Sequence, residues 1–294
     1  MQPQRFAKVA QRFAKKIQIL CMNILVIFYG ALGDMLVATP ALRGLREHYP
    51  DATITFITNT LMPQIAPAGT LANTVISCTD SELNSIFFTA KLGRTLSHQN
   101  FDLAINLRYT SQRSALLTWL SRATVRIGAG PRSAMWCYTM KLDEPSAIHH
   151  EAYRSRDVMT ALGIPVTDLR PFIHVATEHT AFAEKYFSEE QFHGEEKSLT
   201  IAIHPGASQE YRAWRPERFA EIGRRLVRDY KARIIVTWAD HERNVAETVV
   251  RNIGDGAHLA PPTPESERKI MDALDVEFVW EAVDKRVREL HFVP

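Results

Sequence analysis

Residues 24–58 read ILVIFYGALGDMLVATPALRGLREHYPDATITFIT, and this stretch decides the fold. An apolar run ends near Tyr29, a short loop follows between Gly30 and Gly33, and a helical segment starts near Asp34. Ligands of α/β proteins bind at the carboxyl ends of strands, where helix N-termini offer unpaired N–H groups. Asp34 therefore has two interpretations. It caps its helix, or it is a general base at a binding edge.

Strand-like and helix-like segments alternate outward from this stretch. We expect strands at 23–29, 52–57, 74–78, 101–107 and 125–127, and helices at 34–48, 83–98, 111–121 and 149–162. Such alternation is typical of βαβ units on a parallel sheet.

The pattern restarts after a polar segment at 193–198. After this segment we expect strands at 199–203 and 232–238, helices at 216–230 and 242–252, a proline-rich loop after Gly254, and a last helix at 276–290. A charged helix at 178–191 is expected before it, in the first domain. The expected division is a basic extension at 1–22, a first Rossmann-like domain at 23–192 and a shortened second domain at 199–294.

The composition excludes several classes of protein. The 294 residues are 46% hydrophobic with a net charge of +2, which indicates a globular protein and argues against nucleic acid as a partner. Three dispersed cysteines favour neither a disulfide framework nor a zinc site, so we expect a cytoplasmic protein. Serine hydrolase, zinc protease and P-loop motifs are missing from the sequence.

The first residues of the chain are basic. Five positive residues precede the first strand without an acid among them: Arg5, Lys8, Arg12, Lys15 and Lys16. Phe6, Val9 and Phe13 recur at helical spacing. Either this arm is amphipathic and lies on anionic lipid or an acidic acceptor, or it is a frayed extension.

Two loops of the second half carry polar groups. The segment His204-Pro205-Gly206-Ala207-Ser208, with Arg212 beyond it, either offers N–H groups, a hydroxyl and a positive charge to phosphate, or is an ordinary loop. Glu242 follows the next strand and either accepts hydrogen bonds from ribose hydroxyls or lies in a loop where Asp240 caps the helix.

The first half of the chain has two further groups of candidate binding residues, a pair of arginines and a pair of histidines. Arg108 and Arg113 follow the strand FDLAINL and either meet an acidic acceptor or are solvated. His149 and His150 are adjacent, so on a helix they point to different faces, and no third ligand is suitably spaced. We therefore expect no metal and no cofactor.

With these residues in hand, the chain resembles the heptosyltransferases of glycosyltransferase family nine, which build the inner core of bacterial lipopolysaccharide. The resemblance runs over roughly residues 23–253, through GALGDMLVATPALRGLREHYPDATITFIT, FDLAINLRYTSQRSALLTWLSRATVRIG, HHEAYRSRDVMTALGI and IAIHPGASQEYRAWRPERFAEI. It implies the GT-B architecture, in which two Rossmann-like domains face a cleft, with the acceptor on the first and the nucleotide sugar on the second.

The resemblance also implies roles for individual residues. Asp34 matches the catalytic aspartate, Ala207 and Ser208 match the phosphate-binding loop, and Arg212 and Glu242 fall where a basic and an acidic residue meet the nucleotide. The full expectation is catalysis by Asp34, donor binding by His204, Gly206, Ala207, Ser208, Arg212 and Glu242, and acceptor binding by Gly33, Arg108 and Arg113.

The implied reaction is inverting transfer of heptose from ADP-heptose to a Kdo-lipid A acceptor, with peripheral contact of the protein with the inner membrane. One family motif, Asp-Ser-Gly-Pro-x-His, is not found late in this chain. We therefore expect weak donor binding, and two alternatives stay open. The chain is a non-catalytic nucleotide-binding member of the family, or it uses another nucleotide sugar.

Overall fold

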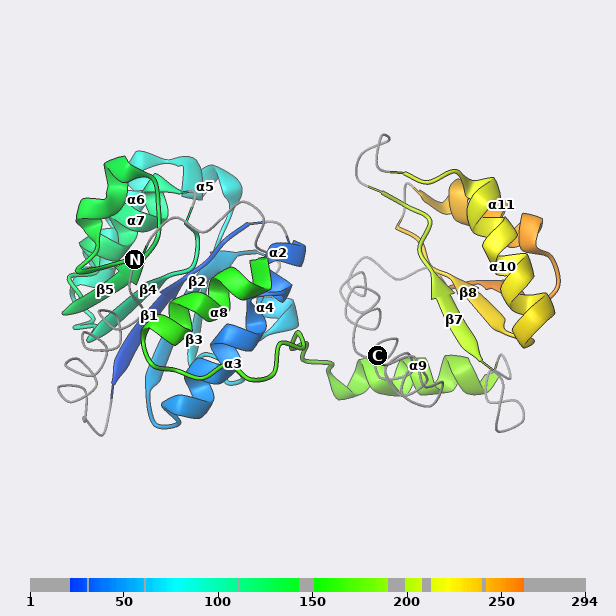
Figure 1. Cartoon of the computed structure of the whole chain (residues 1–294), viewed down its shortest axis with the longest axis horizontal. Helices are drawn as coiled ribbons and strands as arrows, with labels where there is room; N and C mark the ends of the chain where they lie inside the picture. Colours follow the sequence, from blue (N-terminus) through cyan, green and yellow to red (C-terminus); the bar gives the residue numbers. More distant parts are fainter. Residues whose placement is uncertain are drawn as a thin grey trace. The chain divides into compact units, whose positions relative to one another are not determined.

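A computed structural model describes residues 22–30, 32–60, 62–109, 111–142, 151–189, 199–207, 213–239 and 242–261. The chain divides into two compact units, residues 1–174 and residues 175–294 (Figure 1). Each unit is an α/β structure built on its own parallel sheet.

The first unit is built on a six-stranded sheet in the order β3-β2-β1-β4-β5-β6, and every pair in it is parallel. The strands are β1 (Asn23–Ile27), β2 (Thr53–Asn59), β3 (Thr74–Cys78), β4 (Leu103–Asn106), β5 (Val125–Gly128) and β6 (Met140–Lys141). β1 is central and its last four residues are buried, as expected for a strand covered on both faces.

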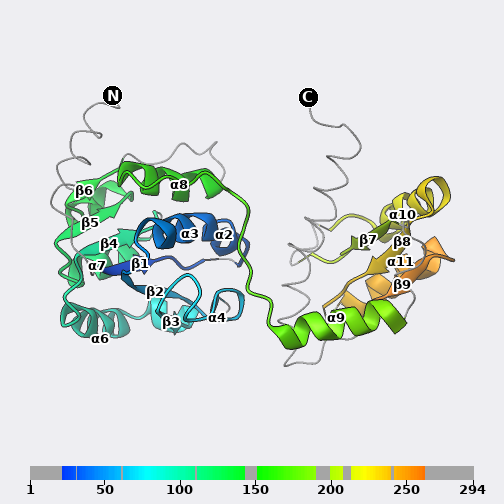
Figure 2. The ribbon, with the colours of Figure 1, turned by 90° about the horizontal axis from the view of Figure 1, so that it is seen from below.

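Helices cover both faces of this sheet (Figure 2). They are α2 (Leu32–Leu36), α3 (Thr39–His48), α4 (Met62–Ile65), α5 (Asp80–Asn84), α6 (Ile86–Ser97), α7 (Gln112–Leu120) and α8 (Glu151–Ala161), with a 3₁₀ turn η1 (Arg132–Cys137). α3 packs on α8, and α6 packs on α7. Leu25 and Ile27 of β1 share one core cluster with Leu92 and Leu96 of α6, so α6 covers the face to which these two strand residues point.

The order of strands brings two loops together. β1 pairs with β2 on one side and with β4 on the other, so the chain reverses its direction across the sheet at β1. Ile27 lies opposite Asn106 at the carboxyl ends of β1 and β4. The loops that follow these two strands therefore start side by side, at the place where α/β sheets bind ligands.

The second unit has a three-stranded parallel sheet in the order β7-β8-β9. Its elements are α9 (Thr177–Glu189), β7 (Thr200–Ile203), α10 (Pro216–Tyr230), β8 (Arg233–Val236), α11 (Arg243–Ile253) and β9 (Ala257–Leu259). Ile234 and Val236 of β8 share a core cluster with residues of α10 and α11. Ile235 points to the other face, where it packs with Tyr186 and Phe187 of α9.

The sequence and the structure differ at several elements. A single helix was expected at 34–48, but Pro40 lies at the start of a separate helix α3, and α2 precedes it. The helix expected at 83–98 is divided at Ser85, whose side chain caps α6 by accepting from the Phe88 N–H. The second sheet has a third strand, β9, where we expected a loop.

Helix α9 belongs to the second unit through its contacts with Ile235 and Ala260. The two units accordingly divide after His174, whereas the sequence suggested a linker at 193–198. The expected basic arm, that linker and the last helix at 276–290 lie outside the described residues. Within the described ranges, no helix has the length and apolar character needed to cross a membrane.

Candidate functional site

Asp34 lies at the carboxyl edge of the first sheet, in the first turn of α2. The helix begins at Leu32, so Asp34 is inside it and is not its N-cap residue. Its side chain is 48% exposed, and its Oδ2 is 3.9 Å from Nη1 of Arg108. The carboxylate is thus open to a ligand and has a positive charge on one side.

Arg108 reaches Asp34 because a buried amide positions its backbone. The backbone N–H of Arg108 donates to Oδ1 of Asn106 at 2.9 Å, and Nδ2 of Asn106 donates to the Tyr138 hydroxyl at 2.5 Å. Burial raises the pKa of Tyr138 to about 12, so this hydroxyl stays protonated and neutral at physiological pH. The last residue of β4 therefore fixes the start of the loop that carries Arg108.

Gly30 leaves the space that the Asp34–Arg108 pair occupies. A Cβ at Gly30 would lie 3.0 Å from Nη1 of Arg108 and 3.7 Å from Oδ2 of Asp34. The Gly30 carbonyl accepts from Nδ2 of Asn59 at 2.6 Å, which ties the loop after β1 to the end of β2. The loop is therefore held from the neighbouring strand, and a side chain at Gly30 would push on the ion pair.

The two other residues expected to bind an acceptor differ in their surroundings. Gly33 is exposed, and a Cβ there would meet nothing within 4 Å. Nη1 of Arg113 donates to the Leu83 carbonyl at 3.2 Å and to Oδ1 of Asn84 at 2.7 Å. Arg113 thus holds the α5 end near α7, while Arg108 is the arginine that faces Asp34.

A second carboxylate lies at the carboxyl edge of the other sheet. Glu242 immediately precedes α11, and its side chain is only 10% exposed. Its Oε2 accepts from the Ala239 N–H at 3.0 Å and is 3.4 Å from Nε2 of His204. Nδ1 of His204 is 3.1 Å from the Thr237 hydroxyl, so the imidazole is held from both ring nitrogens.

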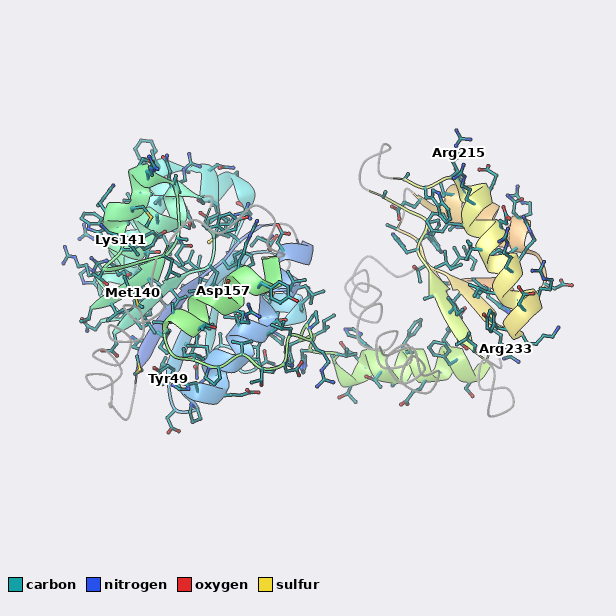
Figure 3. All side chains as sticks on the ribbon, in the orientation of Figure 1. Tyr49, Met140, Lys141, Asp157, Arg215 and Arg233 are labelled. Carbon is teal, nitrogen blue, oxygen red and sulfur yellow. The ribbon has the colours of Figure 1, made fainter. Side chains whose placement is uncertain are left out.

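Gly206 is the residue that makes room for Glu242. A Cβ at Gly206 would overlap all three atoms of the Glu242 carboxylate group, closer than real Cβ contacts allow. Ala207 follows it with intermediate exposure. Ser208 and Arg212, the other expected donor-binding residues, lie outside the described residues. Arg215, labelled in Figure 3, directly precedes α10 on the segment that returns from this loop.

Three residues that build these sites were not among those expected from the sequence. Asn59 ends β2, Thr237 directly follows β8, and Tyr138 directly follows η1. The first two could have been found by their position, because polar residues at the carboxyl end of a parallel strand face the ligand edge. Tyr138 had no such signal, since its role depends on the fold of η1.

The two arrangements offer different chemistry. The open carboxylate of Asp34 can accept a proton from a bound hydroxyl, and Arg108 can bind an anionic group beside it. The enclosed carboxylate of Glu242 can accept hydrogen bonds from ligand hydroxyls. Among the residues with described positions, no group of three His, Cys, Asp or Glu side chains is placed to hold a metal ion.

Several solved structures similar to this chain are glycosyltransferases. A family 9 glycosyl transferase from Veillonella parvula shares 20% identity with a TM-score of 0.72, over 86% of this chain and 72% of that one. The E. coli heptosyltransferase WaaC, solved with ADP-2-deoxy-2-fluoro heptose, shares 19% identity with a TM-score of 0.60, over 86% and 80%.

E. coli ADP-heptose lps heptosyltransferase II shares 19% identity with a TM-score of 0.58, over 86% of this chain and 77% of that one. At about 20% identity, these structural matches show the fold alone. The fold is of the GT-B type, with two α/β units. No curated protein sequence matches this chain.

One protein-family model matches this chain and shows which family it belongs to. It matches residues 89–266, which is more than half of the chain and includes both Arg108 and the whole described Gly206–Glu242 site. Asp34 precedes the matched region. The chain belongs to glycosyltransferase family 9 (heptosyltransferase).

Proposed function

We propose that this chain transfers heptose from ADP-heptose to the inner core of lipopolysaccharide, with inversion at the anomeric carbon. The observation that carries the proposal is the half-exposed Asp34 carboxylate beside Arg108, at the carboxyl edge of the first sheet. The family match and the solved complexes of WaaC with ADP and ADP-2-deoxy-2-fluoro heptose support the choice of donor.

In the proposed reaction, an acceptor hydroxyl attacks the anomeric carbon of the donor. A new C–O bond forms there, the bond to the diphosphate oxygen breaks, and ADP leaves with the electron pair. Asp34 takes the proton of the attacking hydroxyl, and a positioned base of this kind contributes about 10²–10⁴-fold to rate. The transition state has oxocarbenium character, as in glycoside hydrolysis.

Arg108 and Arg113 have separate roles in this proposal. Arg108 binds a phosphate or carboxylate of the acceptor beside Asp34, since its Nη1 is 3.9 Å from Oδ2 of that carboxylate. Arg113 is engaged with Leu83 and Asn84, so it supports the acceptor edge through the position of α5.

The donor binds to the second unit. Glu242 accepts hydrogen bonds from the ribose hydroxyls, and Gly206 and Ala207 offer backbone N–H groups to the diphosphate. His204 is held by Thr237 and lies beside Glu242, where its ring contacts the nucleoside. Ser208 and Arg212 complete the diphosphate site, and Arg212 stabilises charge on the departing ADP.

Transfer from ADP-heptose to an inner-core acceptor, measured as ADP release, tests the proposal. Asp34→Asn should lower kcat by about 10²–10⁴-fold with little change in ADP affinity, because only proton removal is affected. Asp51→Asn is the matched control, since Asp51 is exposed in the turn before β2, at the opposite edge of the same sheet. Equal turnover of wild type and Asp34→Asn would exclude Asp34 as the base.

A second candidate function rests on the missing Asp-Ser-Gly-Pro-x-His motif. A chain that binds ADP by calorimetry but releases none from ADP-heptose with any inner-core acceptor would be a non-catalytic nucleotide-binding member. A chain that turns over only another nucleotide sugar would keep the mechanism and change the donor. Parallel assays with ADP-heptose and other ADP and UDP sugars separate these outcomes.

A further inference from the structure

Helix α6 exposes two large apolar residues at its start. Phe87 is 85% exposed and Ile86 is 57% exposed. Monomeric proteins often expose single apolar residues. An adjacent exposed Ile–Phe pair at the start of a helix indicates instead a surface that contacts an apolar partner.

The fold does not need these two side chains. The inward face of α6 is supplied by Leu92 and Leu96, with Phe88 packed against the same core cluster. Ser85 caps the helix through the Phe88 N–H, so the first turn is held in place. Ile86 and Phe87 are therefore presented on a rigid support whose own core is already filled.

The outward face of α6 is positively charged. Lys91 and Arg94 are both exposed, and they follow Phe87 at i+4 and i+7, on the same side of the helix. No acid occurs between residues 86 and 98. The nearest preceding acid, Glu82, accepts from the N–H and hydroxyl of Thr79, and these hydrogen bonds lower the pKa of its carboxyl group.

This surface lies at the acceptor edge of the first unit. Arg113 in α7 donates to Leu83 and Asn84, which immediately precede Ser85 and α6. The loop from Arg108 leads directly into α7, since the Ser111 N–H donates to the Arg108 carbonyl. Figures 1 and 2 show α6 and α7 on the same face of the first sheet.

We propose that α6 docks the first unit on an anionic bilayer surface, with Ile86 and Phe87 inserted among the acyl chains and Lys91 and Arg94 against anionic headgroups. Exposed apolar side chains gain free energy by entering the acyl boundary of a bilayer, and basic side chains beside them are attracted to anionic lipid headgroups. The inference rests on the proposed function for its purpose, because a lipid-anchored acceptor must be delivered to Asp34 from a membrane.

Vesicle flotation of the full chain tests the docking without any donor. Wild type should bind phosphatidylcholine vesicles containing phosphatidylglycerol and bind pure phosphatidylcholine far less. Ile86→Ser with Phe87→Ser should weaken binding by about tenfold or more. Lys91→Gln and Arg94→Gln should each weaken it by about fivefold at low salt.

Trp136→Ser is the matched control, because Trp136 is also an exposed aromatic residue of the first unit but pairs with Trp119 at the end of α7. It should bind vesicles like wild type. Equal vesicle binding by wild type and the Ile86/Phe87 double variant, with both folded by circular dichroism, would overturn the proposal. A wild-type dimer in sedimentation that the double variant abolishes would also overturn it, by showing that a second copy covers the pair.

Transfer assays keep this inference separate from the proposed function. The double variant should lose activity on acceptor in anionic vesicles and keep activity on a soluble, deacylated acceptor. Vesicle binding that depends on Phe87 in a chain without transfer activity would support the docking and refute the transferase. Transfer with vesicle binding that is indifferent to Ile86 and Phe87 would refute the docking and leave the transferase.

Discussion

Gly206→Ala is the most direct test of how the second site is built. Gly206 is not among the glycines with positive φ, so its backbone accepts an alanine. The obstacle is the Glu242 carboxylate, which occupies the position of the new Cβ. Either the carboxylate must leave its place or the loop after β7 must move.

Both responses lower the free energy of unfolding by a similar amount. If the carboxylate moves, it loses the hydrogen bond from the Ala239 N–H at 3.0 Å. A hydrogen bond to a charged group contributes about 1.5–3 kcal/mol. If the loop moves instead, overpacking costs about 1–3 kcal/mol. We therefore expect the free energy of unfolding to fall by about 2 kcal/mol.

Urea unfolding of Gly206→Ala, measured in wild type and in Glu242→Ala, tests whether the Glu242 carboxylate is the obstacle. With Glu242→Ala the obstacle is gone, so Gly206→Ala should then change the free energy of unfolding by less than about 0.5 kcal/mol. Gly33→Ala is the control, because a Cβ at Gly33 meets nothing within 4 Å. It lies in α2, where alanine should be stabilising by about 0.5–1 kcal/mol. An equal loss from Gly206→Ala in both backgrounds would refute the reasoning.

Two further predictions concern stability of the first unit. Asn106→Ala should lower the free energy of unfolding by about 2–3 kcal/mol in urea, because the buried Tyr138 hydroxyl loses the amide that donates to it and the Arg108 N–H loses its acceptor; no loss would contradict this assignment. Hydrogen bonds from Arg170, with the charge of Arg43, lower the pKa of Asp168 to about 2 from an ordinary value of 3.8. A lowered pKa gives stability that is present above pH 3.8 and is lost as the pH falls towards 2, so Asp168→Asn should flatten the acid limb of a urea-stability series between these values. The effect at pH 7 should stay below about 1 kcal/mol because the pair is partly exposed, and an acid limb identical to wild type would contradict the assignment.

The sequence predicted strands well where β-branched residues are concentrated between clear turn signals. The strand expected at 74–78 coincides with β3, and the helix expected at 216–230 coincides with α10. Both have local causes, namely β-branched composition in the first and Pro216 at the first turn of the second. Elements of this kind need little help from the rest of the molecule.

The errors occurred where tertiary contacts or a single residue decided the boundary. β9 is three residues long and has little signal of its own, but it completes the parallel pairing of β8. The segment expected as one helix is divided before Pro40. The Thr39 hydroxyl donates to the Leu36 carbonyl, and α3 begins at Thr39 with Pro40 in its first turn. A helical hydrophobic pattern continues across such a break, so periodicity does not detect it.

The candidate site was predictable in its residues but not in its pairings. Asp34 and Arg108 were both named from the sequence, yet nothing in their spacing brings them together. Their contact follows from the order β2-β1-β4, which places the loops after β1 and β4 side by side. Likewise Glu242 was named, but its contact with His204 and its dependence on Gly206 required the pairing of β7 with β8.

The two carboxylates differ in a way that suits different tasks. A base must meet the incoming hydroxyl and then lose its proton to solvent, which requires access, and the Asp34 side chain is 48% exposed. A group that recognises a ligand gains from being held in one orientation, and Glu242 is 10% exposed and accepts a hydrogen bond from a backbone N–H.

In both units a glycine in the loop after a strand leaves the space for the carboxylate, Gly30 in one and Gly206 in the other. A methyl group at Gly30 would lie 3.7 Å from Asp34 and press mainly on Arg108, whereas at Gly206 it would displace Glu242 itself. Gly30 therefore affects the spacing of the Asp34–Arg108 pair, whereas Gly206 is required for the Glu242 carboxylate to occupy its position.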